Sequence, residues 1–136
     1  MVDGGWLPIN EGDMPRNISF ALTTEQFKNR SKDVTRRLGW KFLKVGDILM
    51  GCEKVQGIKK GELVRLGLIR VVDVRRERLN QITAEDVIRE GFPEMNRGDF
   101  ITMFIEEMKP DGGVLAPVTR IEFEYLDENN QQMRLF

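Results

Sequence analysis

The sequence predicts an α+β fold, in which short helices flank a strongly curved, mainly antiparallel sheet or partial β-barrel. Its 136 residues suffice for one core, because domains commonly run to roughly 100–200 residues. The hydrophobic patterns follow the order strand, helix, several strands, two short helices, strand. No strand-helix-strand unit repeats, as a parallel sheet would require. The order therefore favours antiparallel pairing.

The chain is expected to consist of an arm, a domain and a tail. Residues 1–16 are acidic and Gly-rich and form the arm, residues 17–126 form the domain, and residues 127–136 form a polar tail. No apolar run of about 18 or more residues occurs, and the start of the chain lacks the basic beginning and apolar middle of a signal peptide. We therefore expect a soluble, cytoplasmic protein with no membrane partner.

Two elements are expected before the first glycine turns. Apolar residues alternate over residues 17–22, which predicts a half-buried strand. Thr23, followed by Gln26 three positions later, matches a capping box for a short helix that reaches about Ser31. Loops are expected from there to the turn at Gly46.

The middle of the chain is predicted to form the centre of the sheet. A strand is expected over residues 48–55, a turn at residues 59–62 and a long strand over residues 63–79. Gly67 interrupts the long strand and predicts a kink there. The Val-rich part of this strand is expected to lie centrally.

Two short helices and a final strand complete the domain. Thr83 is the expected N-cap of the first helix and Gly91 its C-terminal stop. The second helix is expected to start at Asn96, and the last strand covers residues 118–126, where apolar and charged residues alternate. The predicted core-facing stripe of the second helix is Phe100, Met103 and Phe104.

The composition excludes several kinds of chemistry. The chain has no histidine, which removes Ser-His and Cys-His nucleophile pairs and His-rich metal centres. The single cysteine, Cys52, can form neither an intramolecular disulfide nor the usual Cys/His zinc site. It is predicted to be a small buried hydrophobe. We expect no metal and no cofactor, so catalysis would depend on the remaining polar side chains.

Positive charge gathers in one segment, although the formal net charge is only -1. From Lys28 to Lys44 there are seven basic residues against one acid, Asp33, whereas residues 94–128 carry nine acids against three basic residues. The acidic half repels polyanions in general. The segment therefore predicts a basic face for a local anionic partner.

Lys32, Thr35 and the distant Glu90 are the candidate reactive residues. A threonine hydroxyl attacks only when a base takes its proton, and lysine can be that base when burial or nearby cations lower its pKa towards roughly 7–8. Arg36 and Arg37 supply such cations, and a carboxylate could relay the proton to a leaving amine. The plain alternative is that these side chains are solvated surface charges.

The motifs KDVTRR, KVGDIL, ITAEDVIREGF and RIEFEYL together resemble the ASCH domain family, a branch of PUA-like barrels associated with RNA. The resemblance covers residues 17–126. The family signature G-x-K-x-x-T-x-R aligns with Lys32, Thr35 and Arg37, whereas Arg30 stands in place of the glycine. The resemblance implies a PUA-like fold.

The same resemblance implies two classes of function. Compact bacterial members are amidohydrolases that remove the acetyl group from acetylcytidine with a lysine, a threonine and a glutamate, which align with Lys32, Thr35 and Glu90. The implied activity is metal-independent amide hydrolysis on an acylated cytidine-type nucleoside. Other members bind RNA without catalysis, and some cleave it, so these remain alternatives.

The expected partner is a modified nucleoside or RNA, with no DNA. Trp40 is either a core residue or a platform on which a base stacks. The residues expected to bind substrate or RNA are Arg30, Arg36, Arg37, Trp40 and Lys44.

Overall fold

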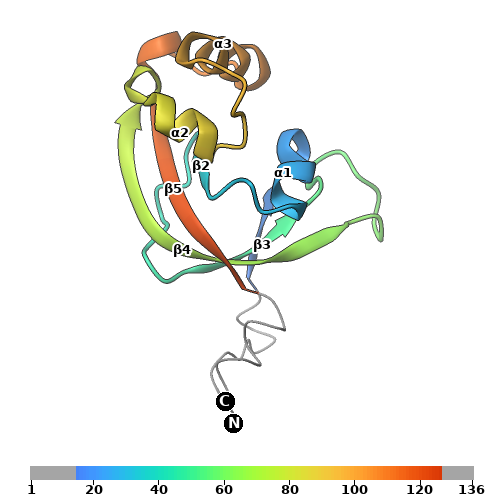
Figure 1. Cartoon of the computed structure of the whole chain (residues 1–136). Helices are drawn as coiled ribbons and strands as arrows, with labels where there is room; N and C mark the ends of the chain where they lie inside the picture. The colour runs from blue at the N-terminus through green and yellow to red at the C-terminus, as the bar shows by residue number, and fades with distance from the viewer. Residues whose placement is uncertain (1–14, 127–136) are drawn as a thin grey trace.

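One five-stranded sheet is the frame of the protein, whose structure is a computed structural model that describes residues 15–126. The strand order is β1-β3-β4-β5-β2 (Figure 1). β1 and β3 pair in parallel, and the other neighbours pair antiparallel. This confirms the predicted mainly antiparallel sheet. The strands are β1 (Arg16–Ser19), β2 (Val34–Arg37), β3 (Ile48–Cys52), β4 (Arg65–Arg78) and β5 (Pro117–Leu126).

The sheet curls, and the helices gather on its concave side (Figure 1). The pairing register shifts between Gly51 and Cys52 and again between Val71 and Asp73, and such bulges bend strands and increase their twist. The first shift lies beside Gly67, the position of the predicted kink. The helices are α1 (Thr24–Lys28), α2 (Ala84–Arg89) and α3 (Arg97–Met108), with 3₁₀ turns η2 (Ala21–Thr23), η3 (Leu79–Gln81) and η4 (Gly113–Leu115).

Gly51 on β3 has no side chain, which lets α1 lie close to the sheet. A Cβ atom at Gly51 would lie 2.6 Å from Cζ of Phe27, the buried residue of α1. That separation is far below van der Waals contact, so a side chain at this position would force the Phe27 ring to move. The phenyl ring instead packs over the β3 backbone, and this contact fixes the start of the chain segment that leads into β2.

The region around Thr23 differs from the prediction in two ways. The first strand ends at Ser19 rather than at residue 22, and the helix ends at Lys28 rather than near Ser31. Thr23 does occupy the N-cap position, but its side chain makes no capping hydrogen bond. The 3₁₀ turn directly before α1 gives Thr23 a ψ of 34°, not the extended backbone that a capping side chain requires.

The segment Val34–Arg37 is a strand where loops were expected. It pairs with β5 in a register that places Val34 opposite Glu122, and its first three residues are buried. Two of its four residues are arginines, so the segment lacks the apolar alternation by which a half-buried strand is recognised. The strand is stable because its buried arginine has charged partners.

Helix capping follows the sequence prediction in the second half of the chain. The Thr83 hydroxyl accepts a hydrogen bond from the backbone N–H of Asp86 at 3.1 Å. The Asn96 side chain accepts one from Asp99 at 2.8 Å. Gly91 follows the C-cap of α2 with a φ of 107° and ends the helix as predicted. These caps fix the position of Glu90, the C-cap residue of α2.

The hydrophobic residues form two clusters. The first, here called the sheet cluster, packs β1, β3, β4 and β5 against α1, and the second, the helix cluster, packs α2 and α3 against the far end of the sheet. The sheet cluster consists of Ile18, Phe20, Phe27, Leu43, Leu49, Ile69, Val71, Ile121 and Phe123. The helix cluster consists of Leu79, Ile82, Val87, Phe100, Phe104 and Val118.

Two further expectations concern the limits of the domain and the membrane. No helix within residues 15–126 is long and apolar enough to span a bilayer. Residues 1–14 of the predicted arm and the predicted tail at residues 127–136 lie outside the described part of the chain. The arm and the tail therefore remain predictions.

Replacing Gly91 with alanine is predicted to destabilise the fold by more than the cost of placing an alanine at a positive φ. The new Cβ would lie 2.8 Å from Cγ and 3.0 Å from Cβ of Gln26, and 3.4 Å from Cβ of Lys32. The matched control is Gly46→Ala, which also has a positive φ but no atom within 4 Å of the new Cβ. Urea unfolding should show a loss of about 1–2 kcal/mol for the control and a larger loss for Gly91→Ala. Equal losses would contradict the steric argument.

Candidate functional site

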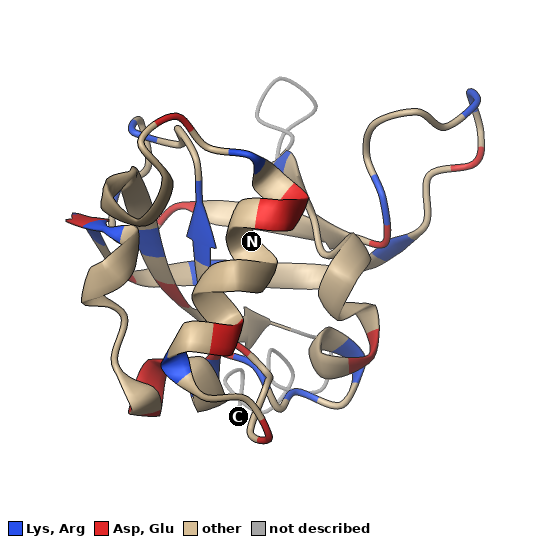
Figure 2. Cartoon of the chain, turned by 90° about the horizontal axis from the view of Figure 1, so that it is seen from above, with Lys and Arg blue, Asp and Glu red and all other residues tan. Residues whose placement is uncertain are grey.

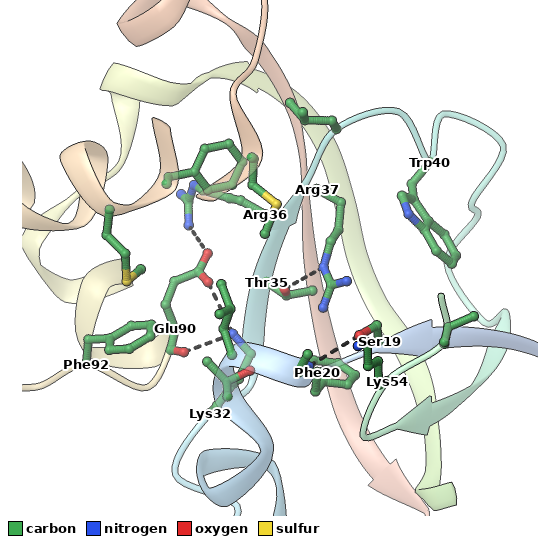
Figure 3. A pocket seen from close by; sticks show the side chains of 18 of the residues that line it. Ser19, Phe20, Lys32, Thr35, Arg36, Arg37, Trp40, Lys54, Glu90 and Phe92 are labelled. Carbon is green, nitrogen blue, oxygen red and sulfur yellow. Dashed lines mark hydrogen bonds and ion pairs between the residues drawn. The ribbon is translucent and has the colours of Figure 1, made fainter. Parts of the chain in front are cut away.

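A cavity of about 490 Å³ opens where the two hydrophobic clusters meet. Its walls come from β2, from the turn after β1, from α3 and from the loop between β3 and β4 (Figure 3). Phe20 of the sheet cluster lines one side, and Phe100 and Phe104 of the helix cluster line another. The cavity has a charged floor and largely apolar walls.

Lys32 and Glu90 form a buried ion pair in this cavity. Their exposed fractions are only 2% and 3%. Nζ of Lys32 donates to the backbone carbonyl oxygen of Glu90 at 2.9 Å and to its Oε1 at 3.2 Å. The Tyr125 hydroxyl donates to the carbonyl oxygen of Lys32 and anchors its backbone. The two reactive candidates, 58 residues apart in the chain, therefore lie in direct contact.

Thr35 lines the same cavity but is bound by a different cation. Its hydroxyl oxygen accepts a hydrogen bond from Nε of Arg37 at 2.9 Å, and its exposed fraction is 3%. No hydrogen bond joins it to Lys32 in the part of the chain that the structure describes. Proton transfer from Thr35 to Lys32 would therefore need one bridging water or a bound ligand between them.

Arg36 lines the cavity and connects three carboxylates. Its Nη1 lies 3.0 Å from Oε2 of Glu90, and its Nη2 lies 2.6 Å from Asp86 and 2.7 Å from Glu77. Arg120 also binds Asp86, at 2.6 Å. Every acid of this cluster thus has a cationic partner. Among residues 15–126 no three His, Cys, Asp or Glu side chains are grouped as a metal site would need.

The neighbouring charges shift the pKa of Lys32 and those of both arginines. Burial lowers the pKa of Lys32; Glu90 opposes this shift, and Arg37 and Arg36 reinforce it. Burial also lowers the pKa of Arg37, to about 10, against the attraction of Glu90. For Arg36 the burial effect is outweighed by its carboxylate partners, so its pKa is raised. The surroundings of Lys32 thus favour its neutral amine more than water does.

The other residues expected to bind substrate or RNA are divided between the cavity and the surface. Trp40 is half-buried, lines the cavity and packs against the sheet cluster. Arg30 is exposed outside the cavity lining, with its guanidinium 5.0 Å from the centre of the Tyr125 ring. Lys44 is also exposed and outside the lining, and its backbone N–H donates to Asp47 in the predicted turn.

The basic segment does not form the single basic face that its composition suggested. Lys32 and Arg36 are buried, and each is bound to a carboxylate. Seen from above, lysines and arginines alternate with acids over the elements (Figure 2). The difference arises because β2 carries part of this charge into the interior, where it is neutralised by α2 and β4.

Sequence reasoning missed most of the cavity wall. Phe92 and the α3 residues Met103 and Met108 line it, as does Lys54 from the loop between β3 and β4. The α3 stripe was predicted as core, and two of its residues serve both purposes, since Phe100 and Phe104 are buried and also face the cavity. No signal in the sequence distinguished a core stripe from one that borders a cavity.

Comparison with known proteins identifies the fold. No protein-family model and no curated protein matches the sequence. The chain is similar to the crystal structure of an ASCH domain from Lactobacillus crispatus JV V101, with a TM-score of 0.50 and 12% identity over 76% of this chain and 70% of that one. The fold is ASCH-like. It is accordingly an α+β fold of the PUA-like kind, as the sequence resemblance implied.

The chain is also similar to two other solved structures. Protein EF3133 from Enterococcus faecalis V583, of family model DUF984, has a TM-score of 0.61 and 16% identity over 84% of this chain and 81% of that one. The hypothetical protein PH0355 has a TM-score of 0.57 and 16% identity over 83% of this chain and 100% of that one. At such identities the likeness concerns the fold and leaves the activity open.

Replacing Arg36 with glutamine is predicted to be severely destabilising. The change would leave Glu77, Asp86 and Glu90 buried with too little positive charge, and breaking a buried ion pair by removing one partner typically costs about 3–5 kcal/mol. The matched control is Arg70→Gln, which removes a partly exposed pair with Glu124 and should cost about 0–1 kcal/mol. Thermal and urea unfolding of both variants measure the difference. Comparable losses would show that the buried cluster has no special role.

Proposed function

We propose that this protein is an amidohydrolase that removes the acyl group from the exocyclic amine of an acylated cytidine-type nucleoside. Thr35 is the nucleophile, Lys32 the general base and Glu90 the proton relay. The reaction converts amide and water to amine and carboxylic acid, without a metal or cofactor. The observation that carries this proposal is the buried Lys32–Glu90 pair beside Thr35 in one cavity.

The burial of Lys32 supports its role as base. A lysine on the surface is protonated at neutral pH and cannot accept a proton. Burial and the cations of Arg37 and Arg36 lower the pKa of Lys32 here, which increases the share of neutral amine. Glu90 then holds the amine in place through its carboxylate and its backbone carbonyl. The pair thus combines a basic nitrogen with a fixed position.

The proposed reaction proceeds through a threonine ester in two stages. Oγ1 of Thr35 bonds to the acyl carbon while its proton passes to Lys32. The bond from the acyl carbon to the exocyclic nitrogen breaks, and the amine leaves with a proton delivered from Lys32 through Glu90. Water then hydrolyses the threonine ester, which releases the carboxylic acid and restores the hydroxyl. Arg37, which donates to Thr35, stabilises negative charge on that oxygen during attack.

The size and walls of the cavity suit a single nucleoside. Its volume of about 490 Å³ lies within the range of roughly 300–1,000 Å³ typical of small-molecule sites. Phe20, Phe92 and Trp40 line it, and aromatic rings provide flat apolar surfaces against which a base can stack. A noncatalytic RNA-binding module would instead present its cations along an open groove, whereas Lys32 and Arg36 are buried. This difference favours the enzymatic proposal.

The hydrolysis rate is predicted to rise with pH as Lys32 loses its proton. Because burial lowers its pKa from the ordinary value of 10.5, the rise in kcat/KM should be centred below that value. The measurement is the pH–rate profile for release of acetate from acetylcytidine. A rate that falls as the pH increases through this range would contradict Lys32 as base.

Two substitutions of Lys32 separate catalysis from phosphate contact. Lys32→Arg keeps the charge but supplies a guanidinium that does not deprotonate. If Lys32 is the base, this variant should lose nearly all hydrolysis, as severely as Lys32→Ala. If Lys32 instead held RNA, Lys32→Arg should bind RNA as well as the parent protein does, and Lys32→Ala should bind it more weakly. Hydrolysis of acetylcytidine and RNA affinity should therefore be measured together.

Substitutions of Thr35 provide the control for folding in this experiment. Thr35→Ser retains a hydroxyl and should keep part of the activity, whereas Thr35→Val has nearly the same shape and should keep almost none. Both should melt within a few degrees of the parent protein, because the side chain is small and its hydroxyl makes a single hydrogen bond within residues 15–126, to Arg37. Full activity in Thr35→Val would exclude threonine as the nucleophile.

A further inference from the structure

Arg36 and Arg37 are adjacent on β2 but have opposite surroundings. Arg36 binds three carboxylates, those of Glu77, Asp86 and Glu90. Arg37 forms no ion pair within the described residues, and its hydrogen bond there is to Thr35. Since its partner is an uncharged hydroxyl, the positive charge of Arg37 is left without a neighbouring anion bonded to it.

The position of Arg37 is fixed, so its free donors have a defined direction. Its guanidinium carbon lies 4.9 Å from the centre of the Phe20 ring, and its Nε is occupied by Thr35. A guanidinium has five N–H groups, and the four on the terminal nitrogens have no partner in residues 15–126. Arg37 lines the cavity. A half-buried guanidinium with free N–H donors in a cavity is well suited to bind an anionic ligand group.

A second cation borders the same part of the cavity. Lys54, from the loop between β3 and β4, also lines it and has no ion pair among the described residues. In the view of Figure 3, Arg37 and Lys54 are drawn on the other side of Thr35 from Glu90. Among the described residues that line the cavity, Glu90 is the sole acid, and it is already bound by Lys32 and Arg36.

We propose that Arg37 and Lys54 form a phosphate-binding subsite, and that the preferred ligand is a nucleotide, a nucleoside that carries a phosphate group. The terminal nitrogens of Arg37 match two phosphate oxygens, as guanidinium groups commonly do, and Lys54 adds a mobile second charge. The acyl group lies at the Lys32–Glu90 end and the phosphate at the other. The identity of the base rests on the proposed function, whereas the phosphate subsite rests on the free cations alone.

Binding measurements test this subsite without requiring any hydrolysis. The ligands are cytidine, its 5′-monophosphate and its 3′-monophosphate, and calorimetry gives their dissociation constants. The parent protein should bind one of the monophosphates about ten- to a hundredfold more tightly than cytidine. Arg37→Gln, which can still donate to Thr35, should bind cytidine as before but lose this preference. Lys54→Gln should lose part of it.

The matched control is Lys59→Gln, a substitution of an exposed lysine in the same loop that does not line the cavity. It should retain the full preference for the monophosphate. Equal affinities for all three ligands in the parent protein would overturn the proposal, as would a preference that survives in Arg37→Gln. Tight binding of a short RNA without any preference among the three ligands would also overturn it and favour an RNA-binding surface.

Inorganic phosphate provides a readout that does not depend on the base. Phosphate, compared with chloride at equal ionic strength, should raise the melting temperature of the parent protein and of Lys59→Gln but not that of Arg37→Gln. No rise in the parent protein would overturn the subsite. If the phosphate effects are present but acetylcytidine is not hydrolysed, the proposed activity fails and the subsite stands.

The stability of ligand-free Arg37→Gln separates binding from a structural role. Removing a cation that has no bonded anion should leave the melting temperature unchanged or raise it, because binding sites are commonly kept at a cost in stability. Arg36→Gln should lower the melting temperature strongly, because it removes a cation that is bonded to three carboxylates. A loss in Arg37→Gln as large as that in Arg36→Gln would assign Arg37 to the framework of β2 and overturn the proposal.

Discussion

The arrangement of the site depends on the contacts of the Arg36 guanidinium. This side chain comes from β2, and its three carboxylate partners come from β4, from α2 and from the C-terminal end of α2. Its exposed fraction is 3%, so these contacts form where water cannot compete for them. A buried cation is tolerated when several hydrogen-bonded anions surround it. Arg36 thereby connects β2, an edge strand of the sheet, to α2, which lies outside the sheet.

The same cluster determines how Glu90 can act. One oxygen of its carboxylate is held by Arg36, which leaves the other for Lys32. Asp86, whose pKa is lowered by Arg120 and Arg36 although its burial opposes the shift, stays ionised and keeps Arg36 in place. Glu90 is therefore oriented by Arg36, which is itself held by Glu77 and Asp86. The geometry of this site is therefore held by buried ion pairs as well as by hydrophobic packing.

The sequence predicted those elements whose formation depends on local signals. Thr83 and Asn96 cap their helices as expected, because capping is decided within a few residues. β2 was missed, since its burial depends on carboxylates more than 40 residues away along the chain, such as Glu77. The capping box at Thr23 failed for a similar reason, because the path of Phe20 into the sheet cluster imposes a 3₁₀ turn there.

The candidate site could be predicted in part. The family resemblance singled out Lys32, Thr35 and Glu90, and the structure places all three in one cavity. The sequence could not reveal that Arg36 and Arg37 differ in their surroundings. Two adjacent arginines look alike in a sequence, and their partners are set by tertiary structure. The apolar wall supplied by α3 was hidden for another reason, since one face of that helix serves the core and the cavity together.

The edge position of β2 has a consequence for the order of folding. β2 pairs with β5 and with no other strand in the described sheet, in a register that places Thr35 opposite Ile121. The contact therefore closes most of the described chain into a loop, and such non-local pairings form slowly because the loop entropy must be overcome first. During synthesis β2 leaves the ribosome early but must wait for β5. Until then its two arginines have no completed interior to occupy, and the cavity is among the last parts of the molecule to form.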